Sequence, residues 1–228
     1  MMEQDSPNAT IFSPAESHSE PSPVDGARPN VVFILADDLG FGDLGLYGNP
    51  LVRTPVLDAM AREGIVLTQH YSAAPICAPA RAAFLTGKYP YRTGQDMSRT
   101  WRGISPKNRT IAHAFRDAGY ATALVGKWHL NGKPGNWLPN ENMPWSMGFD
   151  ESLMCPPFSD YWNWELLENG VPRKSDGRYL TDVLTTEAVR FIDRHRAGRF
   201  FLFLAYNAPH YPLQAREEDA NLFRGSGQ

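Results

Sequence analysis

The chain has 228 residues, of which 42% are hydrophobic and 21% charged, and its formal net charge is -3. This composition excludes a wholly disordered protein and predicts enough apolar surface for a substantial core. The small negative charge argues against a surface dedicated to nucleic acid, and no apolar run is long enough to predict a transmembrane segment. No secretory signal pattern is visible at the N-terminus, which leaves the compartment unknown.

The beginning of the chain differs in composition from the rest. Residues 1–28 are rich in Ser, Pro, Glu and Asp with few large apolar side chains, which predicts a disordered leader. We expect residues 29–228 to form part of one α/β domain. The two cysteines, Cys77 and Cys155, have different contexts, so we expect no disulfide between them and a structural role for Cys155.

The first predicted element is a strand from Val31 to Ala36, which is continuously apolar like a strand buried on both faces of a parallel sheet. It ends at two adjacent carboxylates, Asp37 and Asp38. Carboxylate oxygens suit a hard cation such as Ca²⁺ or Mg²⁺, and zinc is disfavoured because a set of Cys and His ligands is missing. The alternative interpretation is that Asp37 and Asp38 only begin a turn.

Two helices are predicted next. One runs from Pro55 to Glu63, and another begins at Cys77, because Pro79 suits the first turn of a helix. Cys77 would then lie at a helix N-terminus, which carries partial positive charge, and Arg81 would lie on the same face. A potential nucleophile paired with a fixed cation indicates chemistry on an anion. The alternative for Cys77 is a buried structural thiol.

A helix over residues 110–118 precedes a strand over residues 120–125, which leads into Lys127 and His129. Lying two apart on an extended segment, these two side chains would point the same way. Together they would supply a permanent cation and a group that titrates near neutral pH. The alternative is that both are ordinary surface side chains.

The last pair of predicted elements is an amphipathic helix over residues 180–196 and a strand over residues 200–206, which leads into His210. The alternation predicts an α/β fold with a mostly parallel central sheet and helices on both faces. Ligands of such sheets gather at the carboxyl ends of the strands. One pocket would therefore hold a divalent cation together with Arg81, Lys127, His129 and His210, and would suit a tetrahedral oxyanion at sulfur or phosphorus. His210 could otherwise be a turn residue.

Several aromatic residues lie between the second and third predicted strands. They are Trp145, Tyr161, Trp162 and Trp164. Such residues could form a platform for a sugar or aryl group, but packing under a loop is the more typical role.

Motifs in a consistent order make the chain resemble the formylglycine-dependent sulfatases, arylsulfatase-like members of the alkaline phosphatase superfamily. The motifs are Pro29-Asn30-Val31, Leu35 to Asp43, Cys77 to Gly87, Gly126 to Leu130, and Ala208-Pro209-His210 to Leu213-Gln214. The resemblance leaves out only the leader. It implies the alkaline phosphatase-like fold and the hydrolysis of sulfate esters.

The resemblance also implies roles for the site residues. A separate formylglycine-generating or sulfatase-maturating enzyme would oxidise Cys77 to formylglycine, whose hydrated aldehyde attacks the sulfur of a sulfate ester. The second hydroxyl of the hydrated aldehyde would then expel sulfate. Asp37, Asp38 and the modified Cys77 would hold Ca²⁺, with Mg²⁺ the less favoured metal. Arg81 and Lys127 would position formylglycine, His129 would assist proton transfer, and His210 and Lys127 would bind the substrate.

Members of this family are longer and supply further metal ligands and another lysine from sequence beyond the position of Gln228. We therefore expect residues 29–228 to be the N-terminal portion of a sulfatase catalytic domain. Two alternatives stay open. One is a formylglycine-dependent phosphonate monoester or phosphodiester hydrolase, and the other is an inactive fragment that lacks the C-terminal metal ligands.

Overall fold

The structure is a computed structural model, which describes residues 28–95, 102–132 and 140–224. The predicted leader lies outside these residues apart from Arg28. The strands are β1 (Val31–Asp37), β2 (Ala121–Lys127), β3 (Glu151–Cys155), β4 (Glu165–Glu168), β5 (Val171–Lys174) and β6 (Phe200–Pro209). The α-helices are α1 (Pro55–Glu63), α2 (Cys77–Thr86), α3 (Pro90–Thr93), α4 (Ile111–Asp117), α5 (Leu180–His195) and α6 (Glu217–Asn221). Short 3₁₀ turns occupy Phe41–Asp43, Gly45–Tyr47 and Pro144–Met147.

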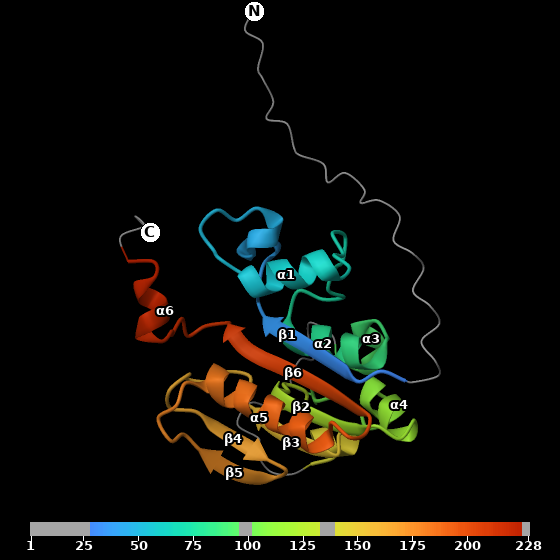
Figure 1. Ribbon diagram of the computed structural model, residues 1–228. Coiled ribbons are helices and arrows are strands. Elements are labelled where there is room, and N and C mark those ends of the chain that lie inside the picture. Colours follow the sequence, from blue (N-terminus) through green and yellow to red (C-terminus); the bar gives the residue numbers. More distant parts are fainter. Residues whose placement is uncertain (1–27, 96–101, 133–139, 225–228) are drawn as a thin grey trace, which may run out of the picture.

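The strands form one sheet in the order β1-β6-β2-β3-β4-β5 (Figure 1). The first four strands in this order are parallel, and β4 and β5 are added antiparallel. The prediction of an α/β fold with a mostly parallel sheet is therefore confirmed. Strands β3 to β5 were not predicted, because each is too short to give a clear apolar pattern.

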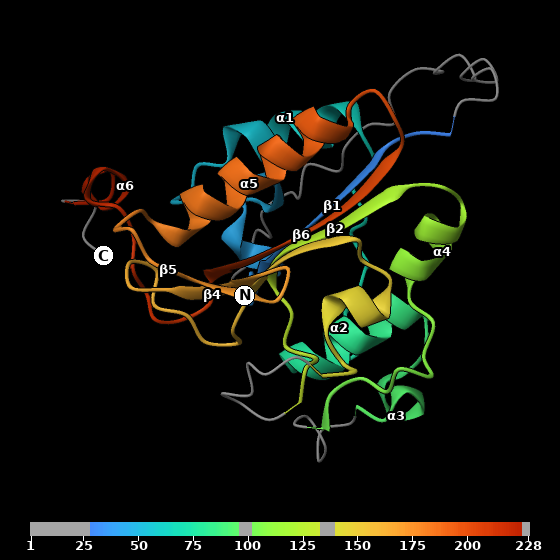
Figure 2. The ribbon, with the colours of Figure 1, turned by 90° about the horizontal axis from the view of Figure 1, so that it is seen from below.

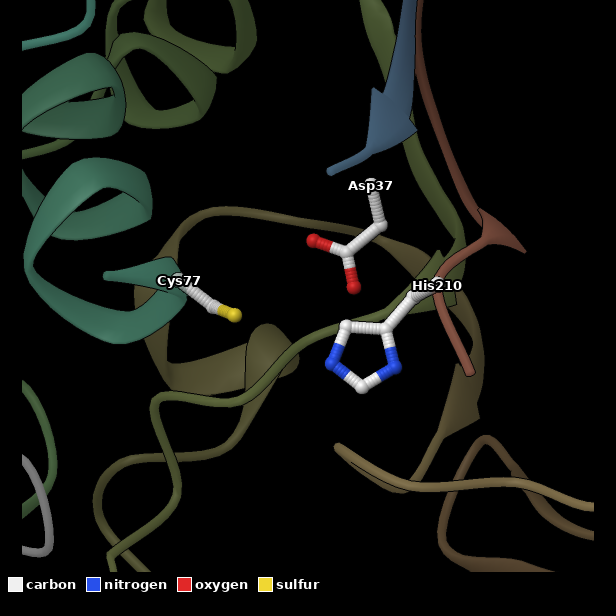
Figure 3. A group of neighbouring side chains, drawn as sticks. All are labelled: Asp37, Cys77 and His210. Carbon is white, nitrogen blue, oxygen red and sulfur yellow. The ribbon is translucent and has the colours of Figure 1, made fainter. Parts of the chain in front are cut away.

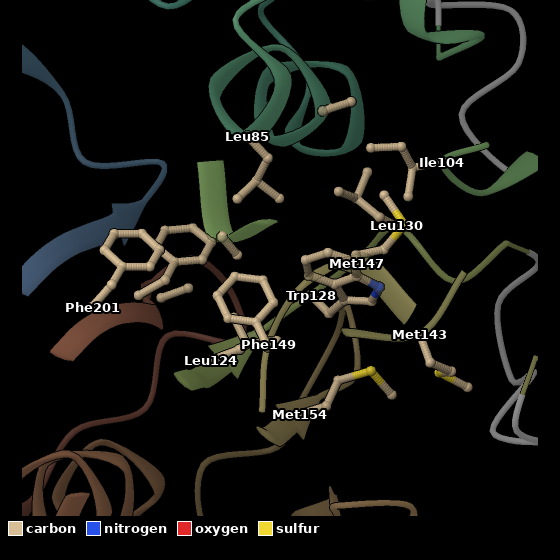
Figure 4. Packing of buried hydrophobic residues seen from close by; sticks show 14 of the residues in the cluster. Leu85, Ile104, Leu124, Trp128, Leu130, Met143, Met147, Phe149, Met154 and Phe201 are labelled. Carbon is tan, nitrogen blue, oxygen red and sulfur yellow. The ribbon is translucent and has the colours of Figure 1, made fainter. Parts of the chain in front are cut away.

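Helices cover both faces of the sheet, as predicted. Helices α2 and α4 lie on one face and α5 on the other (Figure 2). Under α2 and α4 the core is built around large side chains, including Trp128, Phe149 and Phe201 (Figure 4). The ring of Phe33 stacks on that of Phe84 from α2 at 4.1 Å, which fixes the helix against the sheet. Within the described residues, no helix has the length and apolar character needed to cross a bilayer.

The sequence features that predicted where helices begin have the expected effect in the structure. Helix α1 has the predicted bounds, and α2 begins at Cys77. The hydroxyl of Thr110 accepts a hydrogen bond from the backbone N–H of His113 and so caps α4. Strands β2 and β6 run further than predicted, because their backbone pairing continues through polar residues. Lys127 is consequently the last residue of β2 rather than part of a following loop.

Two irregularities shape the carboxyl end of the sheet. Gly126 has φ of 113°, and a side chain there would place its Cβ 1.9 Å from the carbonyl oxygen of Ala205. Only glycine therefore lets β2 approach β6 so closely just before Lys127. The pairing of β1 with β6 also shifts, since Leu35 lies opposite Ala205 but Asp37 lies opposite Pro209. Such bulges commonly redirect side chains beside functional sites.

Candidate active site

Four elements bring the predicted polar residues to one place. Asp37 ends β1, Lys127 ends β2, His210 follows β6, and Cys77 opens α2. Figure 3 shows Asp37, Cys77 and His210 pointing toward one another. A ligand atom from each of these three lies within 4.8 Å of the other two, so they could share a metal ion. The predicted meeting of strand ends is confirmed for these residues.

Asp37 is the centre of the cluster. Its carboxylate accepts a hydrogen bond from Arg81 Nη2 at 3.0 Å and another from the ammonium group of Lys127. The side chains of Arg81 and Lys127 are 2% and 0% exposed, and that of Asp37 is 6% exposed. Burial alone would raise the pKa of Asp37, but the two cations hold this pKa below its usual range. The carboxylate is therefore ionised between two buried cations.

Cys77 lies beside this ion cluster. Lys127 Nζ donates to the Cys77 sulfur at 3.5 Å, and Cys77 is the first residue of a ten-residue helix. The thiol thus faces a buried ammonium group and the partial positive charge of a helix N-terminus, and both favour an anion at this position. Arg81 was predicted to act beside Cys77. Its guanidinium binds Asp37 and the backbone carbonyl of Lys127, the latter at 2.8 Å, which ties α2 to both strands, and its role toward Cys77 stays a prediction.

Asp38 lies at the rim of the cluster. Its φ of 64° is in the left-handed region, and its side chain is 62% exposed, whereas that of Asp37 is buried. Asp38 Oδ2 lies 3.6 Å from His210 Nε2, so both carboxylates still border the same space. The adjacent carboxylates therefore differ in role: one binds cationic side chains inside, and the other is open to solvent.

Hydrogen bonds with Tyr211 and Tyr161 hold His210 in position. Its Nδ1 lies 2.6 Å from the carbonyl oxygen of Tyr211, which can only accept, so Nδ1 carries a proton. The Tyr161 hydroxyl donates to the carbonyl oxygen of His210 at 2.8 Å. These contacts leave Nε2 directed toward Asp38 and available to a ligand.

His129 is buried near the cluster, but the prediction of an extended segment from Lys127 to His129 is wrong. His129 has φ of 59°, because the chain turns sharply after β2 ends. Burial, followed by the charges of Lys127 and Arg81, lowers the pKa of His129 to about 3. The imidazole is therefore neutral at physiological pH.

The aromatic residues divide between core and rim. Tyr161 and Trp164 are buried, which confirms packing as their role, whereas Trp162 is 40% exposed. The rim of the site is formed instead by Phe158, which contacts the rings of His129 and His210. Sequence reasoning did not select Phe158, because it lies in a loop where no periodicity indicates which way a side chain points.

Cys155 differs from Cys77 in its environment. It is 1% exposed, and burial raises the pKa of its thiol. Such a thiol is unreactive, in keeping with the structural role predicted for it. Both cysteines are free, so the prediction that they form no disulfide is confirmed.

The fold and the site together define an α/β protein with a buried cationic centre beside a thiol at the carboxyl edge of a parallel sheet. Such a centre suits an anionic group with tetrahedral geometry. The sequence profile of the Sulfatase family matches residues 29–228, and the chain belongs to this family.

Individual relatives agree with this assignment. The chain is 36% identical to the N-acetylgalactosamine-6-sulfatase of Canis lupus familiaris over 218 residues, which cover 82% of this chain and 41% of that protein. It is 46% identical to the steryl-sulfatase of Mus musculus over 149 residues, covering 60% of this chain and 24% of that protein. The chain thus spans less than half the length of these relatives.

Solved structures support the fold. The crystal structure of Ps i-CgsB superposes with a TM-score of 0.80 at 32% identity, covering 89% of this chain and 50% of that one. The phosphonate monoester hydrolase of Agrobacterium radiobacter superposes with a TM-score of 0.63 at 24% identity, covering 83% of this chain and 43% of that one. The similarity to the phosphonate monoester hydrolase shows a shared fold only. The fold by itself therefore does not distinguish a sulfatase from a phosphonate hydrolase.

Proposed function

We propose that the protein to which this chain belongs hydrolyses sulfate esters to an alcohol and inorganic sulfate, with a nucleophile made from Cys77. The observation that carries the proposal is the placement of the Cys77 sulfur 3.5 Å from Lys127 Nζ and within 4.8 Å of ligand atoms of Asp37 and His210. A nucleophile at residue 77 therefore lies beside the buried cation of Lys127 and beside Asp37 and His210, which could bind a metal.

Oxidation of Cys77 to formylglycine by a separate maturation enzyme would supply an oxygen nucleophile, namely a hydroxyl of the hydrated aldehyde. This oxygen would leave with the sulfate, and hydration of the restored aldehyde would replace it in each turnover. The surroundings of Cys77 fit that group. Lys127 donates to the atom at the end of the side chain, and the start of α2 holds residue 77 at the mouth of the site. Both features would orient an oxygen in place of the sulfur.

The other residues have roles that follow from their charges and contacts. Arg81 and Lys127 offset negative charge that develops on the sulfate oxygens, and Asp37 keeps both cations in position. His129 would assist the proton transfer from the nucleophile. His210 Nε2 and Lys127 would bind the sulfate group or the leaving oxygen.

Asp37 and Asp38 would help to hold a divalent cation, because carboxylates are the oxygen ligands that Ca²⁺ prefers, with Mg²⁺ as the second candidate. Residue 77 and His210 border the same space. The metal would supply positive charge to the substrate oxygens. Because Ca²⁺ takes about six to eight oxygens, Asp37 and Asp38 by themselves would supply only part of its coordination shell.

Calcium is expected to stabilise the folded protein. At ten times its dissociation constant, Ca²⁺ should add about 1.4 kcal/mol to the free energy of unfolding, a rise of about 4 °C in Tm. Differential scanning calorimetry after removal of metal by chelation measures this rise. Asp38→Asn should reduce it, whereas Asp176→Asn, which alters an exposed pair with Arg178, should keep it. An equal rise in Tm on addition of Ca²⁺ to the wild type and to Asp38→Asn would contradict the assignment of Asp38 as a metal ligand.

A substrate panel tests the reaction class. The full-length protein, produced together with a maturation enzyme, is assayed with matched phenyl sulfate, phenyl methylphosphonate and a phosphodiester, and the released anion is quantified. We expect sulfate release to exceed release from either phosphorus substrate by at least about 100-fold, a difference of about 2.7 kcal/mol in transition-state binding. Preference for a phosphorus substrate would favour the phosphonate or phosphodiester hydrolase.

A further inference from the structure

A pair of exposed aromatic rings borders the cationic centre. The ring of Phe158 is 5.7 Å from that of His210 and 6.3 Å from that of His129, and Lys127 Nζ lies 6.0 Å from its centroid. The ring of Tyr211 stacks on His210 at 4.7 Å with an interplanar angle of 24°. Phe158 and Tyr211 are themselves 5.9 Å apart, so the two rings form a continuous aromatic rim.

The rim is open to solvent. Phe158 is 47% exposed and Tyr211 is 62% exposed, whereas Tyr161 and Trp164 are buried in the core. Half-exposed rings leave apolar faces in contact with water, which a ligand can cover with a gain in free energy. Their position beside His210 and Lys127 means that such a ligand would also reach the cationic centre.

The inner and outer parts of the site thus differ in polarity. Its inner part holds Asp37, Arg81 and Lys127, all buried and charged, and fits a small anion. Its outer part includes the exposed faces of Phe158 and Tyr211, which are uncharged. A sulfate ester is divided in the same way, because its charge is confined to the sulfate and its alcohol can be apolar.

On the basis of the proposed sulfatase function, we propose that Phe158 and Tyr211 form the subsite for the leaving alcohol and select alcohols with a flat apolar ring. Aromatic pairs favour stacked or edge-on contact at centroid distances of about 4.5–7 Å, and the exposed faces of Phe158 and Tyr211 are tilted by 37° to each other, so a ring lying against both can stack on one and meet the other at an angle. Neither residue provides charge for the reaction. Their effect is to hold ring-bearing substrates with the sulfur toward residue 77 and the leaving ester oxygen on the side away from it.

The test compares a ring-bearing substrate with one that lacks a ring. In the full-length matured protein, Phe158→Ala and Tyr211→Ala should each lower kcat/KM for phenyl sulfate about tenfold, mainly through KM, the size expected for losing one aromatic contact. The same variants should change kcat/KM for methyl sulfate less than about twofold, because methyl sulfate does not reach the rim. Phe158→Tyr and Tyr211→Phe should restore the wild-type preference.

Tyr91→Ala is the matched control, since Tyr91 is an aromatic residue that is 72% exposed on α3 and does not belong to the rim. It should leave both substrates unchanged. An equal loss for phenyl and methyl sulfate in both rim variants would overturn the proposal, because the rings would then only support the catalytic side chains.

Calorimetric binding of inorganic sulfate and benzenesulfonate separates failure of this proposal from failure of the proposed function. We expect both anions to bind the wild type and only benzenesulfonate to weaken in Phe158→Ala. Sulfate binding together with unchanged benzenesulfonate affinity would overturn the alcohol subsite alone. If neither anion binds, the anion site is wrong, and both proposals fall with it.

Discussion

Replacing Cys77 by alanine is expected to lower kcat/KM for a sulfate ester by about 10⁵-fold, because removing the nucleophile of a covalent mechanism leaves only binding and charge stabilisation. Steady-state assays of the full-length matured protein with phenyl sulfate measure the loss. The side chain of Cys77 contacts Lys127 at the mouth of the site and supports little of the core, so the folded state should persist. An unchanged Tm in the variant would verify this.

Cys155→Ala provides the matched control, since it removes the other thiol from the buried end of β3. It should retain activity within about threefold, with a modest loss of stability from the smaller side chain. Activity of Cys77→Ala within about 100-fold of wild type would show that water attacks sulfur directly. The covalent account would then be wrong.

Replacing Asp37 by asparagine is expected to lower the free energy of unfolding by about 3–5 kcal/mol, because two buried cations lose their shared carboxylate. Arg81 and Lys127 are almost fully buried, so water cannot replace the lost charge without opening the site. Urea unfolding followed by circular dichroism gives the change. Activity should fall as well, even at temperatures where the variant is fully folded, because Asp37 positions both cations.

The exposed pair between Arg109 and Asp117 supplies the control for this measurement. Asp117→Asn also removes a carboxylate from an arginine, but solvent surrounds both groups, so the urea midpoint should not move measurably. A midpoint for Asp37→Asn equal to that of Asp117→Asn would contradict the central role given to Asp37.

Much of the fold follows from local signals in the sequence. Continuous apolar runs predicted β1, β2 and β6, and the Thr110 cap and the Pro55 start placed α4 and α1 within a residue of their observed bounds. Strands β3 to β5 could not be predicted in this way, because their four or five residues depend on pairing with neighbours rather than on their own pattern.

The site could be predicted in outline, since parallel strands place their carboxyl ends at one edge. Its details depend on backbone geometry that no pattern encodes. The left-handed conformations of Asp38 and His129 turn these residues away from the directions expected for extended chain. The link from Arg81 to Asp37 joins residues 44 apart in sequence, and the position of Phe158 depends on a loop.

The most direct test of the account is the mass of the tryptic peptide from Glu63 to Arg81, taken from protein produced with a maturation enzyme. Residue 77 should carry oxygen in place of the sulfur and two hydrogens of cysteine, as in formylglycine. An unmodified Cys77, in cells that convert a control sulfatase, would contradict the proposed nucleophile.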